Sequence, residues 1–180
     1  IFDIQSQDNN VSATITHPFL RSRMANFYGS ATLEARNTVT DVLGTLFYQD
    51  KLRILRLNSA YDFVDDSTAV NRLSTTFSKG FGWDDNSANY TRSRGNARPD
   101  FMKMEAQASR LQPLDDQFSI YAGATAQVSA NTLVASEQFA LGGPSYGSAY
   151  DPSELTGDSG FALRSELQYT RTNDIDFLPA

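Results

Sequence analysis

The stretch Ala25–Arg36, ANFYGSATLEAR, decides the fold class, because its side chains alternate in character with a period of two. Every second residue is small or apolar: Phe27, Gly29, Ala31, Leu33 and Ala35. The residues between them are mostly polar and end in Glu34 and Arg36. Successive side chains of a β-strand point to opposite faces, so the stretch predicts a strand with one apolar and one polar face.

The same alternation recurs on both sides of this stretch. It covers Val11–Thr16, Leu52–Val64, Val70–Phe81, Asp100–Arg110, Gln117–Ser129 and 161–170, and a strand over Leu133–Phe139 is predicted after a bulge. Residues 5–10 form a predicted polar turn, His17-Pro18 is expected to end the first strand, and 37–51 and 82–99 are predicted loops. The sum is about seven strands and no helix, an all-β antiparallel fold.

Composition excludes several classes of protein. The chain has 180 residues, a formal net charge of −6 and no cysteine. It therefore forms no disulfide and no thiolate-zinc site, and the negative charge argues against a nucleic-acid partner. No apolar run reaches the length of a transmembrane helix.

The alternation fits a membrane barrel or a soluble sheet. The strands are long, and short turns at 65–67 and 113–116 alternate with long connections, as in outer-membrane barrels. Charged residues in the polar face would line a wet lumen: Glu34, Arg36, Arg56, Asp62, Lys103, Glu105, Arg164 and Glu166. We therefore favour an antiparallel transmembrane β-barrel; the alternative is a soluble antiparallel β domain that binds a ligand or glycan through its long loops.

No catalytic or cofactor site is predicted. The single histidine, His17, cannot support a Ser-His-Asp arrangement at a strand end. The acidic pairs Asp65-Asp66 and Asp84-Asp85 are typical of solvated loops, and Gly142-Gly143 lacks the spacing of a dinucleotide site. We expect neither an enzyme nor a bound metal or cofactor.

The connection Glu137–Asp158, EQFALGGPSYGSAYDPSELTGD, is too long for an ordinary hairpin loop. It is rich in glycine, proline and serine, and it also carries Phe139, Tyr146 and Tyr150. Those aromatic residues predict a packed loop with a function.

Together with GDSG at 157–160, this connection resembles the transporter of bacterial two-partner secretion, the hemolysin secretion/activation protein family. Further similar segments are PFLRSR at 18–23, Asn26–Arg36, LRILRL at 52–57 and SRLQPL at 109–114. The resemblance implies a sixteen-stranded barrel in the bacterial outer membrane. Such a barrel passes an unfolded partner exoprotein and contacts outer-membrane lipid and lipopolysaccharide.

The resemblance also implies that the loop at 140–160 enters the lumen and gates it. The residues that match the family's loop motif are Gly142, Gly143, Ser148, Ala149, Tyr150, Asp151, Glu154 and Asp158. The family carries an arginine where this chain has Ser148, so the family's arginine latch is not carried over.

Residues 1–180 would then be a single barrel segment with about seven to eight of the sixteen strands, a fragment of a larger transporter. The alternative is a small closed barrel, in which Val11–Thr16 would pair with Phe161–Arg171.

Overall fold

The computed structural model describes residues 3–83 and 91–171. Seven strands form one antiparallel sheet in the order β1-β2-β3-β4-β5-β6-β9. Their bounds are β1 (Ile4–Arg21), β2 (Ala25–Val42), β3 (Thr45–Val64), β4 (Val70–Gly80), β5 (Met102–Pro113), β6 (Phe118–Ser129) and β9 (Gly160–Tyr169). A short 3-10 helix, η1 (Ala135–Glu137), and a small hairpin of β7 (Phe139–Leu141) and β8 (Leu155–Gly157) lie between β6 and β9.

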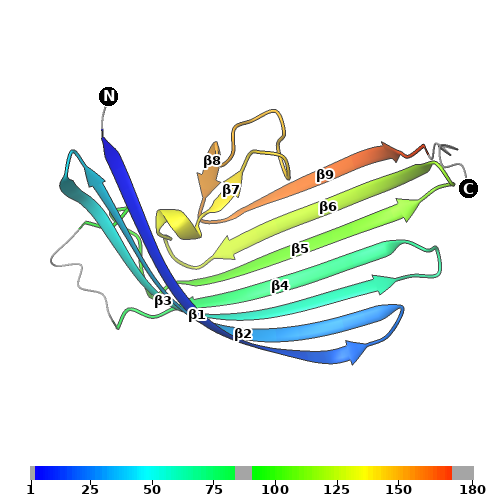
Figure 1. Ribbon diagram of the computed structural model, residues 1–180, viewed down its shortest axis with the longest axis horizontal. Coiled ribbons are helices and arrows are strands. Elements are labelled where there is room, and N and C mark those ends of the chain that lie inside the picture. The colour runs from blue at the N-terminus through cyan, green and yellow to red at the C-terminus, as the bar shows by residue number, and fades with distance from the viewer. Residues whose placement is uncertain (1–2, 84–90, 172–180) are drawn as a thin grey trace, which may run out of the picture.

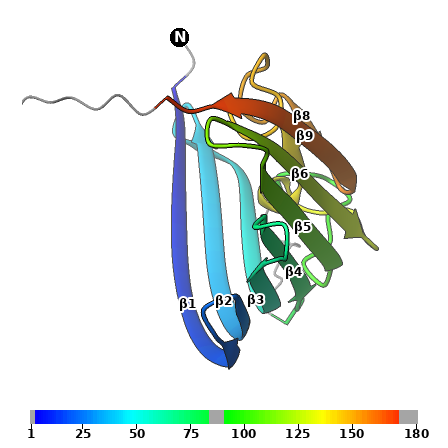
Figure 2. The same cartoon turned by 90° about the vertical axis from the view of Figure 1, so that its right-hand side faces the viewer.

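The sheet is strongly curved, and the β7–β8 hairpin stands over its concave face (Figures 1 and 2). The predicted all-β antiparallel fold is confirmed. In the described residues β1 and β9 lie at opposite edges of the sheet and do not pair, so the small closed barrel is wrong. No helix in 3–83 or 91–171 is long and apolar enough to cross a bilayer.

The first three strands are longer than the sequence predicts. The expected turn at 5–10 and loop at 37–51 belong to strands, because Ile4 pairs with Val42 and β2 continues to a tight turn at Leu43-Gly44. The alternation that marks a strand is lost there, because 5–10 is polar on both faces, as in the Ser6–Thr40 hydroxyl pair at 3.0 Å, and because the apolar residues Leu46 and Phe47 are adjacent in sequence.

Two further expectations about strand limits are wrong. Proline at position 18 does not end β1; the register shifts between Pro18 and Leu20, and proline is tolerated in a strand beside such an irregularity. The strand predicted over Leu133–Phe139 is instead an irregular segment that leads into η1, and Phe139 begins the short strand β7. Leu133 and Val134 are buried in an apolar cluster there.

The convex face of the sheet is apolar and uncovered. Partners in an antiparallel pair share a face, and one row across five strands reads Ala31, Leu57, Phe77, Met104 and Val128. Val128 is 67% exposed, and Leu163 in the neighbouring β9 is 74% exposed. A continuous exposed apolar face of this kind is a surface for lipid or another protein.

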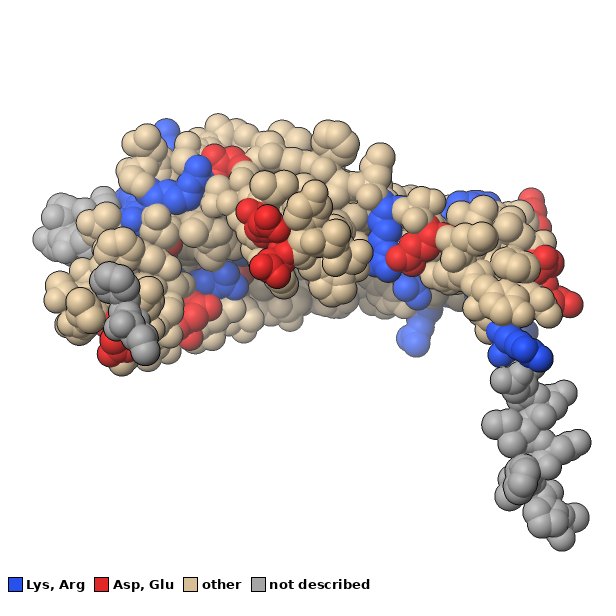
Figure 3. All heavy atoms as spheres, turned by 90° about the horizontal axis from the view of Figure 1, so that it is seen from above, with Lys and Arg blue, Asp and Glu red and all other residues tan. Residues whose placement is uncertain are grey.

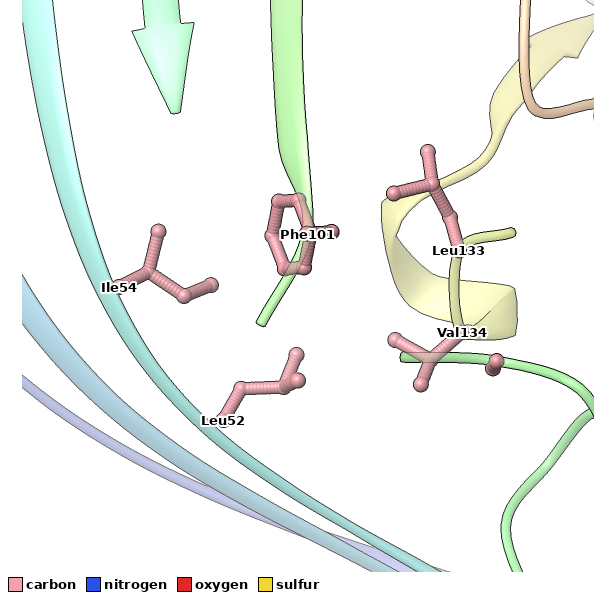
Figure 4. Packing of buried hydrophobic residues seen from close by; sticks show 6 residues of the cluster. Leu52, Ile54, Phe101, Leu133 and Val134 are labelled. Carbon is pink, nitrogen blue, oxygen red and sulfur yellow. The ribbon is translucent and has the colours of Figure 1, made fainter. Parts of the chain in front are cut away.

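The buried apolar core is small and lies on the concave side. Loops from 91–101 and 131–138 pack against β3 there, and the cluster comprises Leu52, Ile54, Ala97, Phe101, Leu133 and Val134 (Figure 4). Burial of each large side chain contributes about 1.5–3 kcal/mol. The cluster thereby fixes the start of the long connection to β9 against the sheet.

Candidate functional site

An ionic cluster joins the long connection to the concave wall. Glu137 of η1 is 2% exposed, and its carboxylate accepts a hydrogen bond from Nη2 of Arg56 at 2.7 Å. Lys103 Nζ lies 3.0 Å from its other oxygen. Arg56 also donates to Glu34 at 2.8 Å, and Arg36 lies 2.9 Å from Glu34. The cluster therefore ties η1 to β2, β3 and β5.

The charges in this cluster are balanced. Three cations, Arg36, Arg56 and Lys103, face Glu34 and Glu137, and Glu105 lies 3.4 Å from Lys103 as a third acid. Burial alone would raise the pKa of Glu137, but the hydrogen bond from Arg56 and the charge of Lys103 outweigh it and lower that pKa. Glu137 is therefore a carboxylate at neutral pH.

Uncharged side chains complete the hydrogen bonding. The Gln127 amide donates to the carbonyls of Glu137 at 3.1 Å and of Asp158 at 3.0 Å. Ser78 accepts from Arg56 at 3.0 Å. Gln127 thus holds the two roots of the loop, residues 137 and 158, with one side chain.

Asp158 anchors the second root. Its Oδ1 accepts from the backbone N–H of Leu133 at 3.1 Å, and Arg94 makes an ion pair with it. Burial alone would raise the pKa of Asp158. The hydrogen bonds from Arg94 and Leu133 lower the pKa by more than burial raises it, so the net shift is a decrease. Asp158 therefore joins the β8–β9 junction to the segments before β5 and before η1.

The loop between β7 and β8 is folded on itself. The N–H groups of Gly142 and Gly143 donate to the carbonyls of Tyr146 and Tyr150, both at 3.0 Å. Gly142 has φ +119°, and a Cβ there would lie 2.0 Å from the Asp151 carbonyl. Only glycine fits this position.

The remaining motif residues lie at the outer part of the loop. Glu154 accepts a hydrogen bond from the N–H of Asp151 at 3.2 Å. Ser148, Ala149 and Tyr150 are exposed. The Ser148 hydroxyl has no partner among the described residues, so this position does not tie the loop to the wall.

All eight charged residues of the predicted polar face lie on the side of the sheet that carries the loop. They form three groups. Glu34, Arg36, Arg56, Lys103 and Glu105 belong to the ionic cluster. Asp62 lies apart and faces Arg72 at 3.8 Å, and Arg164 pairs with Glu166. Seen from the loop side, acidic and basic side chains are interspersed (Figure 3).

Four residues of the site were not predicted as site residues: Gln127, Ser78, Glu137 and Arg94, the partner of Asp158. Gln127 and Ser78 lie on the predicted polar face, and Ser78 pairs with Lys103 in the ladder. Glu137 opens the EQF motif, but its partners are distant in sequence. Within 3–83 and 91–171, no three histidine or acidic side chains converge as a metal site.

Residues 2–179 match the family described as Haemolysin secretion/activation protein ShlB/FhaC/HecB. The chain belongs to this family. The family comprises two-partner secretion transporters of the bacterial outer membrane, so the predicted family and location are confirmed and the soluble alternative is wrong. No curated protein sequence matches this chain well enough to count as a relative.

Among solved structures, CdiB from Escherichia coli superposes on this family member with a TM-score of 0.81 at 20% sequence identity. The match covers 99% of this chain and 33% of the CdiB chain, so the chain spans about one third of that transporter's length. The similarity confirms the predicted barrel-type fold, with the curved sheet as an unclosed part of a barrel wall.

Proposed function

We propose that this chain forms part of the wall and the gate of a pore through which a secreted partner polypeptide crosses the outer membrane unfolded. The observation that carries the proposal is the attachment of the long loop across the polar concave face, through Glu137 at one root and Asp158 at the other. Membership in a transport family supports it.

In this proposal further strands complete the barrel, because an open sheet edge is not tolerated in lipid. The convex apolar face contacts lipid and lipopolysaccharide, and the eight charged residues of the concave face line the lumen. Charges of both signs suit a passing polypeptide, since no large field of one sign would retain it. We assign the chain no catalytic role.

The gate is tested in planar bilayers with the full-length transporter. Residues 143–157 are replaced by a short Gly-Ser turn, and we expect a higher single-channel conductance. Shortening the β2–β3 tip at 43–46, which lies away from the loop in Figures 1 and 2, is the matched control. Unchanged conductance after loop trimming would refute the gate.

The path of the polypeptide is tested in the same full-length protein with a photo-crosslinking amino acid. Gln107 lies on the concave face and its neighbour Ala106 on the convex face. With an exoprotein stalled during secretion, we expect adducts from position 107 and none from 106. Adducts from 106 alone, or from neither position, would contradict translocation along this face.

A further inference from the structure

Arg164 of β9 connects the wall to the tip of the loop. Its Nη1 donates to the carbonyls of Ser145 at 3.2 Å and Pro144 at 3.3 Å. Its Nε donates to Glu166 at 2.7 Å, and its guanidinium lies 5.5 Å from the centre of the Tyr121 ring. A planar guanidinium can serve an acid, a ring and two carbonyls at once, which a lysine cannot.

Tyr146 of the loop lies beside this arginine and packs over Gly123 of β6, where the missing side chain leaves a gap that we call the notch. Gly123 is the register partner of Arg164, and a Cβ added there would lie 3.2 Å from the Tyr146 hydroxyl and 3.0 Å from that of Tyr121. The absent side chain leaves room for both tyrosines. Below them is a hollow of about 230 Å³ that Asp62, Arg72 and Gln107 help to line.

We propose that Arg164, with the notch at Gly123, is a wall-side clamp that positions the loop tip and holds the gate closed. The proposal rests on the gate proposed above. The tip offers backbone carbonyls and Tyr146, while Ser148 is exposed and reaches no wall residue among those described. The donor is thus on the barrel wall rather than on the loop.

The clamp is weaker than the attachment of the loop at Glu137. The Arg164 side chain is 35% exposed and its bonds to the loop exceed 3.1 Å, whereas Glu137 is almost fully buried with a 2.7 Å bond. A long, exposed hydrogen bond contributes less to stability than a short, buried hydrogen bond that involves a charged group. The tip therefore detaches from the wall while Glu137 stays in place.

Hydrogen–deuterium exchange of the full-length transporter in detergent tests the clamp. In Arg164→Gln we expect about tenfold faster exchange at the amides of Gly142, Gly143 and Tyr150, because the charged donor is lost. The amides around Glu137 should be unchanged. Arg164→Lys keeps the charge beside Glu166 but not the planar fork, and it should give an intermediate increase while preserving the fold.

Arg98→Gln is the matched control, because Arg98 also pairs with an acid two residues along the chain, Asp100, at 2.7 Å, and its side chain is 59% exposed. Its loop amides should exchange as in the parent protein. Equal exchange of the loop amides in Arg164→Gln and Arg98→Gln would overturn the clamp.

Conductance separates the two proposals. Faster exchange of the loop amides in Arg164→Gln, with unchanged conductance after trimming 143–157, supports the contact between Arg164 and the loop tip but refutes the gate. Higher conductance after trimming 143–157, with unchanged loop exchange in Arg164→Gln, supports the gate and refutes the clamp.

Discussion

Glu137 places a buried carboxylate between cations from two strands, Arg56 of β3 and Lys103 of β5. Removing one member of a buried ion pair leaves the other charge without compensation, which costs about 3–5 kcal/mol. Replacement of the carboxylate by an amide should therefore weaken the attachment of η1 more than any exposed substitution on this face.

Glu137→Gln in the full-length transporter is expected to lower the temperature at which the folded band on a cold SDS gel converts to the unfolded band. The matched control is Glu105→Gln, because Glu105 is 38% exposed and contacts the same lysine at 3.4 Å. Equal transition temperatures for the two variants would show that the buried cluster does not stabilise the barrel.

The partners of Glu137 were predictable from sequence, but Glu137 itself was not. Arg56 and Lys103 are charged residues within alternating strands, so the face they occupy follows from the period of two. Glu137 lies in a segment read as a strand, and its contacts span 81 residues to Arg56. No local pattern encodes a contact of that sequence separation.

The β7–β8 hairpin keeps its loop compact through backbone hydrogen bonds at two glycines, Gly142 and Gly143. Gly142 combines a positive φ with contact to the Asp151 carbonyl, so any side chain meets both strain and a clash. Backbone strain of this type costs about 1–3 kcal/mol.

Gly142→Ala is expected to loosen the loop and increase the open-channel noise in planar bilayers. Gly95→Ala is the control, since a Cβ at Gly95 would meet no atom within 4 Å. If both variants show the same open-channel noise as the parent protein, the turn at Gly142 has no part in holding the loop.

The elements that sequence predicted well are those with contrasting faces. The strands β4, β5 and β6 agree with the expected ranges to within a few residues, because apolar and polar residues alternate along them. The outer ends of β1 and β2 were missed because they are mostly polar on both faces, and the start of β3 was missed because its apolar residues, Leu46 and Phe47, are adjacent and break the alternation. The β7–β8 hairpin was missed because three-residue strands carry no periodicity.

At the scale of the whole molecule the two faces of the sheet have opposite surroundings. The convex face exposes rows of apolar side chains, and the concave face holds the charges and the loop. A lipid-exposed position near the middle of the membrane tolerates arginine poorly, at a cost of about 2–4 kcal/mol.

Leu163→Arg on the convex face should lower the urea midpoint of the full-length protein folded into lipid vesicles. Thr125→Arg is the matched substitution on the concave face, one register step away, and should leave the midpoint nearly unchanged. A larger loss for Thr125→Arg than for Leu163→Arg would reverse the assignment of the faces.

The contact between Arg56 and Glu137 also depends on the register of the strands. Neighbouring strands of the sheet follow one another along the chain, from β1 to β6 and then β9. A slip of one residue in any pairing would turn every side chain of that strand to the opposite face and carry Arg56 or Lys103 into lipid. Because Glu137 follows β6, its ionic cluster closes only when β2, β3 and β5 have been laid down in the correct register.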